Sequence, residues 1–258
     1  MNSINANTNA INAANAIGAA ATSILTLETL FSGYGELPVL HDITLEVGQG
    51  EIFSVVGANG AGKTTLLLTI SGHLAPHSGR VTFDGQDISR MPAHGAAERG
   101  LVMVPEGGRL FPFMTVLENL ELGAYHPQAR ARQAETLDEV MRLFPILAER
   151  RGQLAGRLSG GERQMCAVAR AMMALPKLLM LDEPSLGLAP IMVDKVFEMV
   201  EELVRSKGLS VLLVEQNVGN ALRLCRHGCI LEHGHILKMG PGEELLRDPD
   251  VQRSYMGL

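Results

Sequence analysis

The segment 55–65, which reads VVGANGAGKTT, carries the residues with the clearest chemical potential. An apolar run ends at Gly57, and the spacing G-x-x-x-x-G-K-T then places Gly62, Lys63 and Thr64 in succession. Glycines let backbone N–H groups approach phosphate oxygens because no Cβ blocks them, and a helix that starts here adds its positive dipole end. The lysine can reach the outer phosphates, and the threonine hydroxyl can bind the Mg²⁺ that accompanies them.

This spacing predicts a loop that binds a nucleoside triphosphate together with Mg²⁺. The bland alternative, a glycine-rich turn that happens to precede Lys-Thr, would arise in roughly 1% of chains of this length, and the flanking strand and helix disfavour it further. The residues assigned to the site are Gly57, Asn59, Gly60, Gly62, Lys63, Thr64 and Thr65.

Two acidic residues, Asp182 and Glu183, close a second apolar run, LLMLDEP at residues 178–184. Ligands of open α/β sheets bind at the C-terminal ends of the strands, which is where these carboxylates fall. Asp182 suits a role in holding Mg²⁺, and Glu183 suits polarising an attacking water. Two adjacent carboxylates are costly in such a place without a cation, which favours a functional interpretation over a structural one.

The segment 158–164, LSGGERQ, has the spelling of a helix start. Ser159 and Glu162 have capping-box spacing, so a helix is predicted to begin at this point. The serine hydroxyl and the free amides of the first turn form an anion site. A helix start alone would be unremarkable, but seven residues in this order are far more specific.

Tyr34 precedes Gly35 and can supply an aromatic platform for the base of a nucleotide. The alternative is a tyrosine packed at the edge of a sheet.

The remaining patterns predict the secondary structure. A turn is predicted at 31–35, and Thr115 and Glu118 again have capping-box spacing. The stretches predicted as strands are 24–30, 43–47, 51–56, 79–85, 101–104, 178–184 and 210–214, with a hairpin over 228–239 that turns at His233-Gly234. The predicted helices follow Thr65, start at Thr115, form one or two segments in 128–150, and span 159–174, 191–207 and 218–226.

Composition limits the function classes. The 258 residues suffice for one α/β domain with or without a subdomain. A net charge of −6 argues against broad binding of nucleic acid, which needs a basic surface. No apolar run reaches the ~18 residues of a membrane span, so any link to a membrane is expected to pass through a partner. The three cysteines, Cys166, Cys225 and Cys229, are predicted to be buried free thiols in a reducing compartment.

Residues 1–22 are rich in Asn and Ala and have few large apolar side chains. No lysine or arginine precedes Lys63, so these residues are neither a secretory signal nor an arginine-rich transit peptide. We expect a disordered tail, and a cloning extension or a misassigned start would explain it. Residues 23–258 are expected to form the functional domain.

Taken together, the segments 57–64, 158–164 and 178–184 resemble the ATP-binding subunit of ABC transporters, and the resemblance covers about 24–258. It implies an α/β fold of the P-loop NTPase type. Such a fold has a RecA-like core with a mainly parallel sheet, an antiparallel β subdomain, and an inserted α-helical subdomain at roughly 107–165. In such cassettes two copies enclose two ATP molecules head to tail, so the resemblance implies ATP and Mg²⁺ as cofactors and a second cassette as partner.

The resemblance also implies roles for single residues. Tyr34 resembles the aromatic that stacks on adenine, Glu183 the catalytic base, and the loop 185–189 the segment that crosses the dimer interface. The residues that resemble those presented to the γ-phosphate of the partner are Ser159, Gly160 and Gly161.

Two positions depart from the usual pattern of the family. Glu106 stands where Gln generally reaches Mg²⁺, and Gln216 stands where a switch histidine follows the last core strand. Glu106 still offers an oxygen to the metal, as Thr64 and Asp182 do, but it brings a full negative charge toward the γ-phosphate. Gln216 can donate a hydrogen bond there but cannot take up a proton near neutral pH. We therefore expect slow ATP hydrolysis by the chain alone and full catalysis with a dissimilar partner, with Glu183, Gln216 and Glu106 as the catalytic set.

These departures, with PEGGRLFPFMTVLENL, LDEPSLGLAP and LLVEQN, resemble one subgroup, the second ATP-binding subunit of branched-chain amino-acid uptake systems of the hydrophobic amino-acid family. Urea-type and lipopolysaccharide-type relatives are less similar, because both normally keep Gln at position 106 and the lipopolysaccharide type has His at 216. The resemblance implies a peripheral ATPase at the cytoplasmic face of a bacterial inner membrane. Its partners would be permease subunits, docked on the segment around 107–113, and indirectly an external solute-binding protein, with no nucleic acid.

Two other functions stay open at this point. A soluble ABC ATPase acting on ribosomes or DNA is disfavoured because such proteins usually carry two cassettes or long coiled-coil insertions. A P-loop kinase or GTPase is disfavoured by LSGGERQ and by the lack of an NKxD-type motif for reading the base. The transported substrate itself is not encoded in a cassette, so it rests on the resemblance alone.

Overall fold

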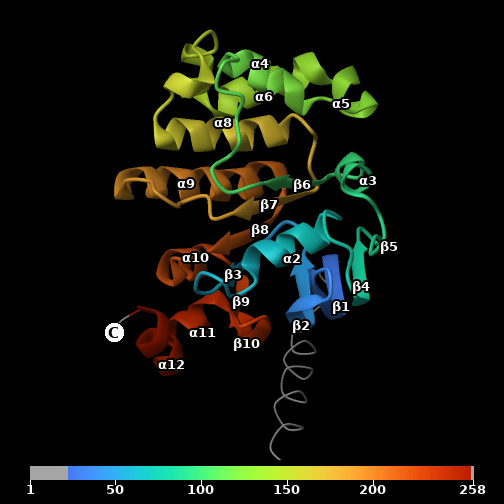
Figure 1. Cartoon of the computed structure of the whole chain (residues 1–258). Coiled ribbons are helices and arrows are strands. Elements are labelled where there is room, and N and C mark those ends of the chain that lie inside the picture. Colours follow the sequence, from blue (N-terminus) through green and yellow to red (C-terminus); the bar gives the residue numbers. More distant parts are fainter. Residues whose placement is uncertain (1–22, 257–258) are drawn as a thin grey trace, which may run out of the picture.

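The structure is a computed structural model that describes residues 23–256, so the tail expected at 1–22 lies outside the described residues. Figure 1 shows helices stacked above a parallel sheet, with an antiparallel sheet below and to one side. The antiparallel sheet has the strand order β2-β1-β4-β5, and the larger sheet has the order β10-β9-β3-β8-β7-β6. This is the α/β fold of the P-loop type that the sequence predicts.

The larger sheet is parallel except at one edge. Its parallel strands are β9 (His227–Glu232), β3 (Ile52–Val56), β8 (Ser210–Glu215), β7 (Leu178–Asp182) and β6 (Leu101–Val104), and β10 (His235–Pro241) pairs antiparallel with β9. Every residue of β3, β7 and β8 is buried. Strands covered on both faces read as continuous apolar runs, which is why the sequence predicts them well.

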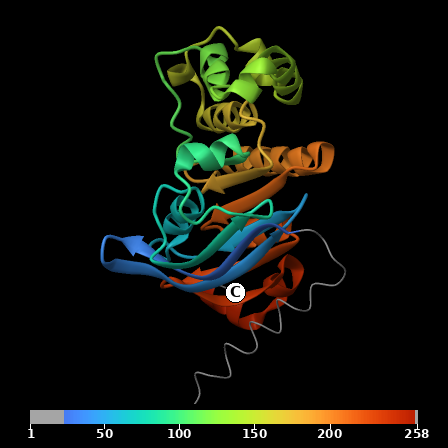
Figure 2. The ribbon, with the colours of Figure 1, turned by 90° about the vertical axis from the view of Figure 1, so that its right-hand side faces the viewer.

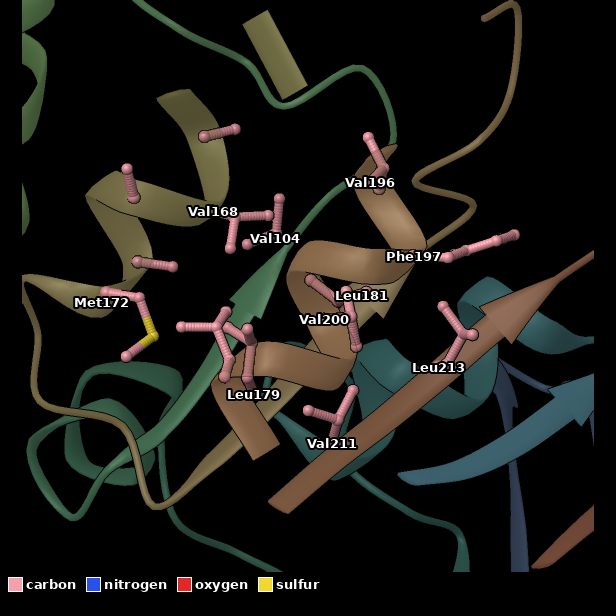
Figure 3. Close-up of a cluster of buried hydrophobic side chains, with 14 of the residues drawn as sticks. Val104, Val168, Met172, Leu179, Leu181, Val196, Phe197, Val200, Val211 and Leu213 are labelled. Carbon is pink, nitrogen blue, oxygen red and sulfur yellow. The ribbon is translucent and has the colours of Figure 1, made fainter. Parts of the chain in front are cut away.

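Alternate side chains of the central strands serve two separate cores. On one face, Leu179, Leu181, Val211 and Leu213 pack with Val196, Phe197 and Val200 of the helix α9 (Pro190–Lys207), as Figure 3 shows. On the other face, Met180 and Leu212 join Leu66 and Leu67 of α2 (Lys63–Ile70). The period of two along a strand thus fixes α2 and α9 on opposite sides of the sheet.

The antiparallel sheet corrects one prediction. It consists of β1 (Ser23–Tyr34), β2 (Leu37–Gly48), β4 (Ser78–Phe83) and β5 (Gln86–Asp87). The turn predicted at 31–35 is wrong, because β1 continues to Tyr34, which pairs with Leu37. Gly33 is a place of close backbone approach within this hairpin, since a Cβ there would lie 2.0 Å from the Leu37 carbonyl oxygen. Its glycine therefore marks packing within a strand, and the turn falls at residues 35–36.

A helical layer lies at one end of the molecule, above α9 in Figures 1 and 2. It contains α4 (Val116–Gly123), α5 (Pro127–Ala131), α6 (Gln133–Leu143), α7 (Pro145–Glu149) and α8 (Gly160–Met172). Residues 128–150 thus form parts of three helices instead of the one or two predicted, with breaks at Arg132 and Phe144. The capping boxes predicted at Thr115 and Ser159 are both confirmed.

Shorter elements complete the described chain. They are α3 (Ala93–Glu98), α10 (Val218–Leu224), α11 (Gly242–Arg247), α12 (Pro249–Val251) and two single turns, Ala155–Arg157 and Gln252–Met256. Cys166, Cys225 and Cys229 are buried and free, as predicted. Within residues 23–256, no helix combines the length and the hydropathy that crossing a membrane would require.

Candidate active site

The predicted site residues gather where three neighbouring strands of the parallel sheet end. The strands β3, β8 and β7 lie side by side, with Val56 opposite Glu215 and Asp182 opposite Val214. Parallel strands direct their C-terminal ends to the same edge, so the loops that follow them emerge together. The register of the sheet therefore brings together groups that lie more than a hundred residues apart in sequence.

The glycines of the phosphate loop (residues 57–64) are required by local geometry. Gly60 and Gly62 have positive φ angles of 80° and 106°, a region that residues with a Cβ rarely adopt. Gly57 is glycine for a different reason than the predicted approach of phosphate, since a Cβ there would lie 2.2 Å from the Leu231 carbonyl oxygen. The helix α2 starts within this loop, at Lys63, so its first amides face the same space.

Lys63 is buried, and its ammonium has three partners. Its Nζ donates to the carbonyl oxygens of Gly57 at 2.9 Å and Ala58 at 3.0 Å, and it lies 3.0 Å from Glu183 Oε1. A buried cation is tolerated only when it is paired and hydrogen-bonded, as this one is. A phosphate group in the loop would compete with these partners for the ammonium.

Thr64 and Asp182 form the second polar contact between the loop and the acidic strand end. The Thr64 hydroxyl donates to Asp182 Oδ1 at 3.3 Å. Burial raises the pKa of Asp182 above its ordinary value; the bond from Thr64 opposes this shift, and the negative charges of Glu183 and Glu106 add to it. The structure thus joins two of the predicted metal ligands, Thr64 and Asp182, by a hydrogen bond. The third, Glu106, is exposed just after the neighbouring strand β6 and acts on Asp182 through its charge.

This donor set fits Mg²⁺ bound together with nucleotide. Mg²⁺ prefers oxygen ligands, usually takes only one or two from protein, and completes its shell with water and phosphate oxygens. Among residues 23–256, no three His, Cys, Asp or Glu side chains converge into a metal site of their own. Thr64, Asp182 and Glu106 would therefore hold the ion with the help of phosphate oxygens.

Glu183 has an unusual backbone. Its φ is +46°, in the left-handed region that disfavours residues with a Cβ, and its amide still donates to the Val214 carbonyl at 2.9 Å. Such strain persists only where surrounding structure enforces it, and it is concentrated at functional sites. The conformation agrees with the prediction that Glu183 performs chemistry.

Tyr34 lies beside the phosphate loop, as a base platform requires. It ends β1, its ring is half exposed, and its hydroxyl accepts a hydrogen bond from the Thr65 hydroxyl at 3.4 Å. Thr65 belongs to the first turn of α2. The tyrosine is therefore held at the entrance of the loop with part of its ring open to a ligand.

Gln216 and the interface loop (residues 185–189) lie on the other side of Glu183. Together with Glu183 and Ser185, the exposed Gln216 lines a cavity of about 560 Å³. The buried Glu215 lies between them and accepts hydrogen bonds from the amides of Ser185 and Gln216. Sequence reasoning missed Glu215 as a site residue. Its signal was available, because an acid at the end of a fully apolar strand has the same pattern as Asp182.

The serine–glycine turn (residues 159–161) is not part of this cluster. Ser159 is exposed and caps α8, where its hydroxyl accepts from the Glu162 amide. Gly161 is buried against Met192, whose Cε would lie 2.0 Å from a Cβ there, and Gly160 faces Leu188. No hydrogen bond or ion pair joins this turn to residues 57–65 in the described chain. Figure 1 places α8 in the helical layer and α2 on the far side of α9.

A second cavity, of about 440 Å³, lies at the opposite ends of the strands and has no part in this site. Lys177 and Ser210, at the starts of β7 and β8, line it together with Lys207. Its two lysines are paired with Asp84 and Glu139. The chemistry of the molecule is thus concentrated at the C-terminal edge of the sheet.

The sequence and the fold match those of known proteins. The family profile described as ABC transporter matches residues 40–186. The chain is 44% identical to the high-affinity branched-chain amino acid transport ATP-binding protein BraG of Pseudomonas aeruginosa, covering 91% of this chain and 100% of that protein. It is 38% identical to the lipopolysaccharide export system ATP-binding protein LptB of Haemophilus influenzae, covering 91% and 98%. The ADP conformation of MJ1267, an ATP-binding cassette of an ABC transporter, superposes with a TM-score of 0.81 at 30% identity, covering 92% and 100%.

The buried Asp182 carboxylate allows a stability test. Because its pKa is raised in the folded state, its ionisation opposes folding, and that penalty builds up as the pH rises from the ordinary pKa of aspartate to the raised one. Asp182→Asn should therefore raise the thermal midpoint at pH 7, without nucleotide, by about 2–4 °C, or roughly 1 kcal/mol for a chain of this size. The gain should shrink as the pH falls toward the ordinary pKa of aspartate. Differential scanning fluorimetry checks both, with the exposed Asp138→Asn as control, and a destabilised Asp182→Asn at pH 7 contradicts the prediction.

Proposed function

Since the chain belongs to the ABC transporter family of ATP-binding cassettes and is therefore an ATPase, we propose that it powers a bacterial uptake system for branched-chain or similar apolar amino acids. It would act at the cytoplasmic face of the inner membrane, attached through its partners. The observation that carries the catalytic part of this proposal is the contact of Lys63 with Glu183 at the ends of β3 and β7.

The contact suggests how nucleotide binding prepares hydrolysis. The phosphate loop binds the β- and γ-phosphates through its amides and Lys63. Lys63 then exchanges its bond to Glu183 for phosphate oxygens, which frees a carboxylate oxygen to polarise the attacking water. Gln216 donates a hydrogen bond to the γ-phosphate from the neighbouring strand end. Thr64, Asp182 and Glu106 hold Mg²⁺, which supplies charge neutralisation at the phosphates when bound.

A second cassette is needed to complete the site. The serine–glycine turn offers a serine hydroxyl and free helix amides, a good anion site, yet it lies apart from the phosphate loop of its own chain. An exposed anion site of this kind is available to the triphosphate held by another copy. We propose head-to-tail pairing, in which Ser159, Gly160 and Gly161 of each cassette face the γ-phosphate of the other.

Glu106 and Gln216 favour a dissimilar partner. The charge of Glu106 already raises the pKa of Asp182, so its field reaches the metal ligands and opposes a γ-phosphate. Gln216 cannot bind a proton that a histidine would take up. Both effects slow hydrolysis at the site of this chain, and a partner cassette with the usual residues would supply the faster site.

Exposed apolar side chains of the segment 111–125 support docking on a permease. Phe113 is 91% exposed, and Phe111, Leu122 and Tyr125 are about half exposed. The buried Asn119 fixes the loop that carries the two phenylalanines, because its side chain both donates to and accepts from the backbone of Phe111. Exposed apolar side chains held rigidly in this way are typical of protein interfaces.

The substrate class rests on similarity. BraG, whose name states branched-chain amino acid transport, is more similar to this chain than LptB, whose name states lipopolysaccharide export. Glu106 and Gln216 also separate the chain from the lipopolysaccharide-type pattern. The ribosome or DNA alternative gains no support from a net charge of −6.

Reconstitution tests the proposal as a whole. The chain is combined in proteoliposomes with the permeases, the second cassette and the binding protein of the proposed system, and ATP-dependent uptake of radiolabelled leucine, isoleucine and valine is measured. We expect uptake of all three, and an ATPase rate well above that of the isolated chain. Vesicles without the binding protein serve as control. Vigorous ATP hydrolysis without uptake of any of the three would rule out the substrate class.

The role of Glu183 predicts a separation of binding from hydrolysis. Glu183→Gln keeps the size of the side chain but removes the base, so kcat should fall by about 10²-fold or more while ATP binding persists. With ATP the variant should accumulate as a dimer in light scattering. Lys63→Ala, the matched control, should lose nucleotide affinity instead. Wild-type turnover by Glu183→Gln would show that another group is the base.

The exposed side chains of the segment 111–125 predict a loss of assembly. Phe113→Ser removes the most exposed aromatic side chain of this segment and should abolish co-purification with the permease subunits. Leu237→Ser, at a half-exposed position on β10, is the matched control and should co-purify normally. Equal recovery of the two variants with the permease would place the docking surface elsewhere.

A further inference from the structure

Glu215 occupies a central position at the end of β8. The residue is 2% exposed, and its two carboxylate oxygens accept from different segments. Oε1 accepts from the Ser185 amide at 2.9 Å, and Oε2 accepts from the Gln216 amide at 3.2 Å. The Glu215 carbonyl oxygen also accepts from the Gly57 amide at 3.4 Å. One residue therefore contacts the interface loop, the γ-phosphate-facing Gln216 and the start of the phosphate loop.

A carboxylate is an expensive choice for this place. Burial raises the pKa of Glu215, and the charge of Glu183 raises it further, although hydrogen bonds from Ser185 and Gln216 oppose the shift. No lysine or arginine forms an ion pair with Glu215 in the described chain. A buried charge without a cationic partner reduces stability, so the need for a carboxylate lies elsewhere.

The need follows from the geometry of two donors. The amides of Ser185 and Gln216 leave the ends of adjacent strands and point at one side chain, which must accept twice. A carboxylate has two acceptor oxygens, whereas a glutamine has one acceptor and an NH₂ group that would face an amide N–H. The Glu215 carboxylate therefore joins the interface loop to Gln216 through two charge-assisted bonds.

We propose that Glu215 is a positioning residue for ATP hydrolysis, whose carboxylate fixes the interface loop and Gln216 to each other beside Glu183. Closure of the dimer moves the interface loop, and Glu215 passes that movement to the group that contacts the γ-phosphate. The inference rests on the roles proposed above for Glu183 and Gln216. It adds the residue that holds their geometry when the partner cassette approaches.

Glu51 provides a matched control. Its carboxylate also accepts from a backbone amide, that of Gly48 at 2.9 Å, and its side chain is 10% exposed. It lies just before β3, at the other end of the sheet from the phosphate loop, and unlike Glu215 it has basic neighbours, His227 at 3.3 Å and Arg226 at 3.8 Å. Glu51→Gln therefore makes the same chemical change at a similar contact without touching the site.

The test compares Glu215→Gln, Glu215→Asp and Glu51→Gln in the assembled transporter. We expect kcat of Glu215→Gln to fall at least tenfold. The KM for ATP should stay within about twofold of wild type, and the thermal midpoint of the purified chain should fall by no more than about 2 °C. Glu215→Asp, which keeps both oxygens, should recover part of the lost kcat. Amide hydrogen exchange at Ser185 or Gln216 should become faster in Glu215→Gln alone. Glu51→Gln should keep kcat within twofold.

The following results overturn the inference. The first is a kcat of Glu215→Gln within twofold of wild type. The second is a loss of activity that Glu51→Gln shows as well, and the third is a loss of activity that is accompanied by a lowered thermal midpoint of Glu215→Gln. If Glu215→Gln does not fold, the test uses Glu215→Asp instead. A wild-type kcat of Glu215→Asp together with faster amide hydrogen exchange at Ser185 also overturns the inference. Failure of the proposed function is distinguishable, because in that case the wild-type transporter itself shows no amino-acid uptake, or Glu183→Gln keeps full turnover.

Discussion

One buried ammonium governs the charged edge of the parallel sheet. Lys63 is the only lysine or arginine that is buried among residues 23–256, and it shares this edge with the buried acids Asp182, Glu183 and Glu215. It is paired with one of them, which leaves an excess of negative charge in a region of low dielectric. This excess of negative charge favours the binding of a further cation and disfavours the binding of an anion without one. A nucleotide that brings a metal ion with it would therefore bind at this edge more favourably than the nucleotide alone.

The parallel sheet is what creates this concentration of charge. The phosphate loop, Glu183 and Gln216 each follow a separate strand, and only the order β3-β8-β7 makes their ends neighbours. The strands themselves are uniformly apolar and make no distinction between ligands. Their contribution is rigidity, because a core on each face holds the three ends in place. Specific chemistry then depends on the few residues just beyond the strands.

Local patterns predict much of this fold, and long-range contacts account for what they miss. The phosphate loop and both capping boxes follow from spacing within a few residues. The end of β1 was predicted wrongly because Gly33 looks like a turn residue, whereas its close neighbour is Leu37 across the hairpin. Glu215 was missed because its partners, Ser185 and Gln216, come together only in the folded sheet. The sequence can indicate a buried acid at the end of an apolar strand, but it cannot identify the amides that the acid binds.

The same contacts join the serine–glycine turn to the groups around Glu183 within one chain. The interface loop and the start of α9 pack on the serine–glycine turn, since Gly160 and Gly161 leave room only for Leu188 and Met192. At its other end, Ser185 is bound to Glu215 and thereby to Gln216. In the proposed head-to-tail dimer, a partner that contacts this loop would act both on the serine–glycine turn and on the groups around Glu183. Because Glu215 is buried and its two bonds are directional, a shift of the loop at Ser185 would also shift Gln216, which would couple the closing of the two proposed nucleotide sites.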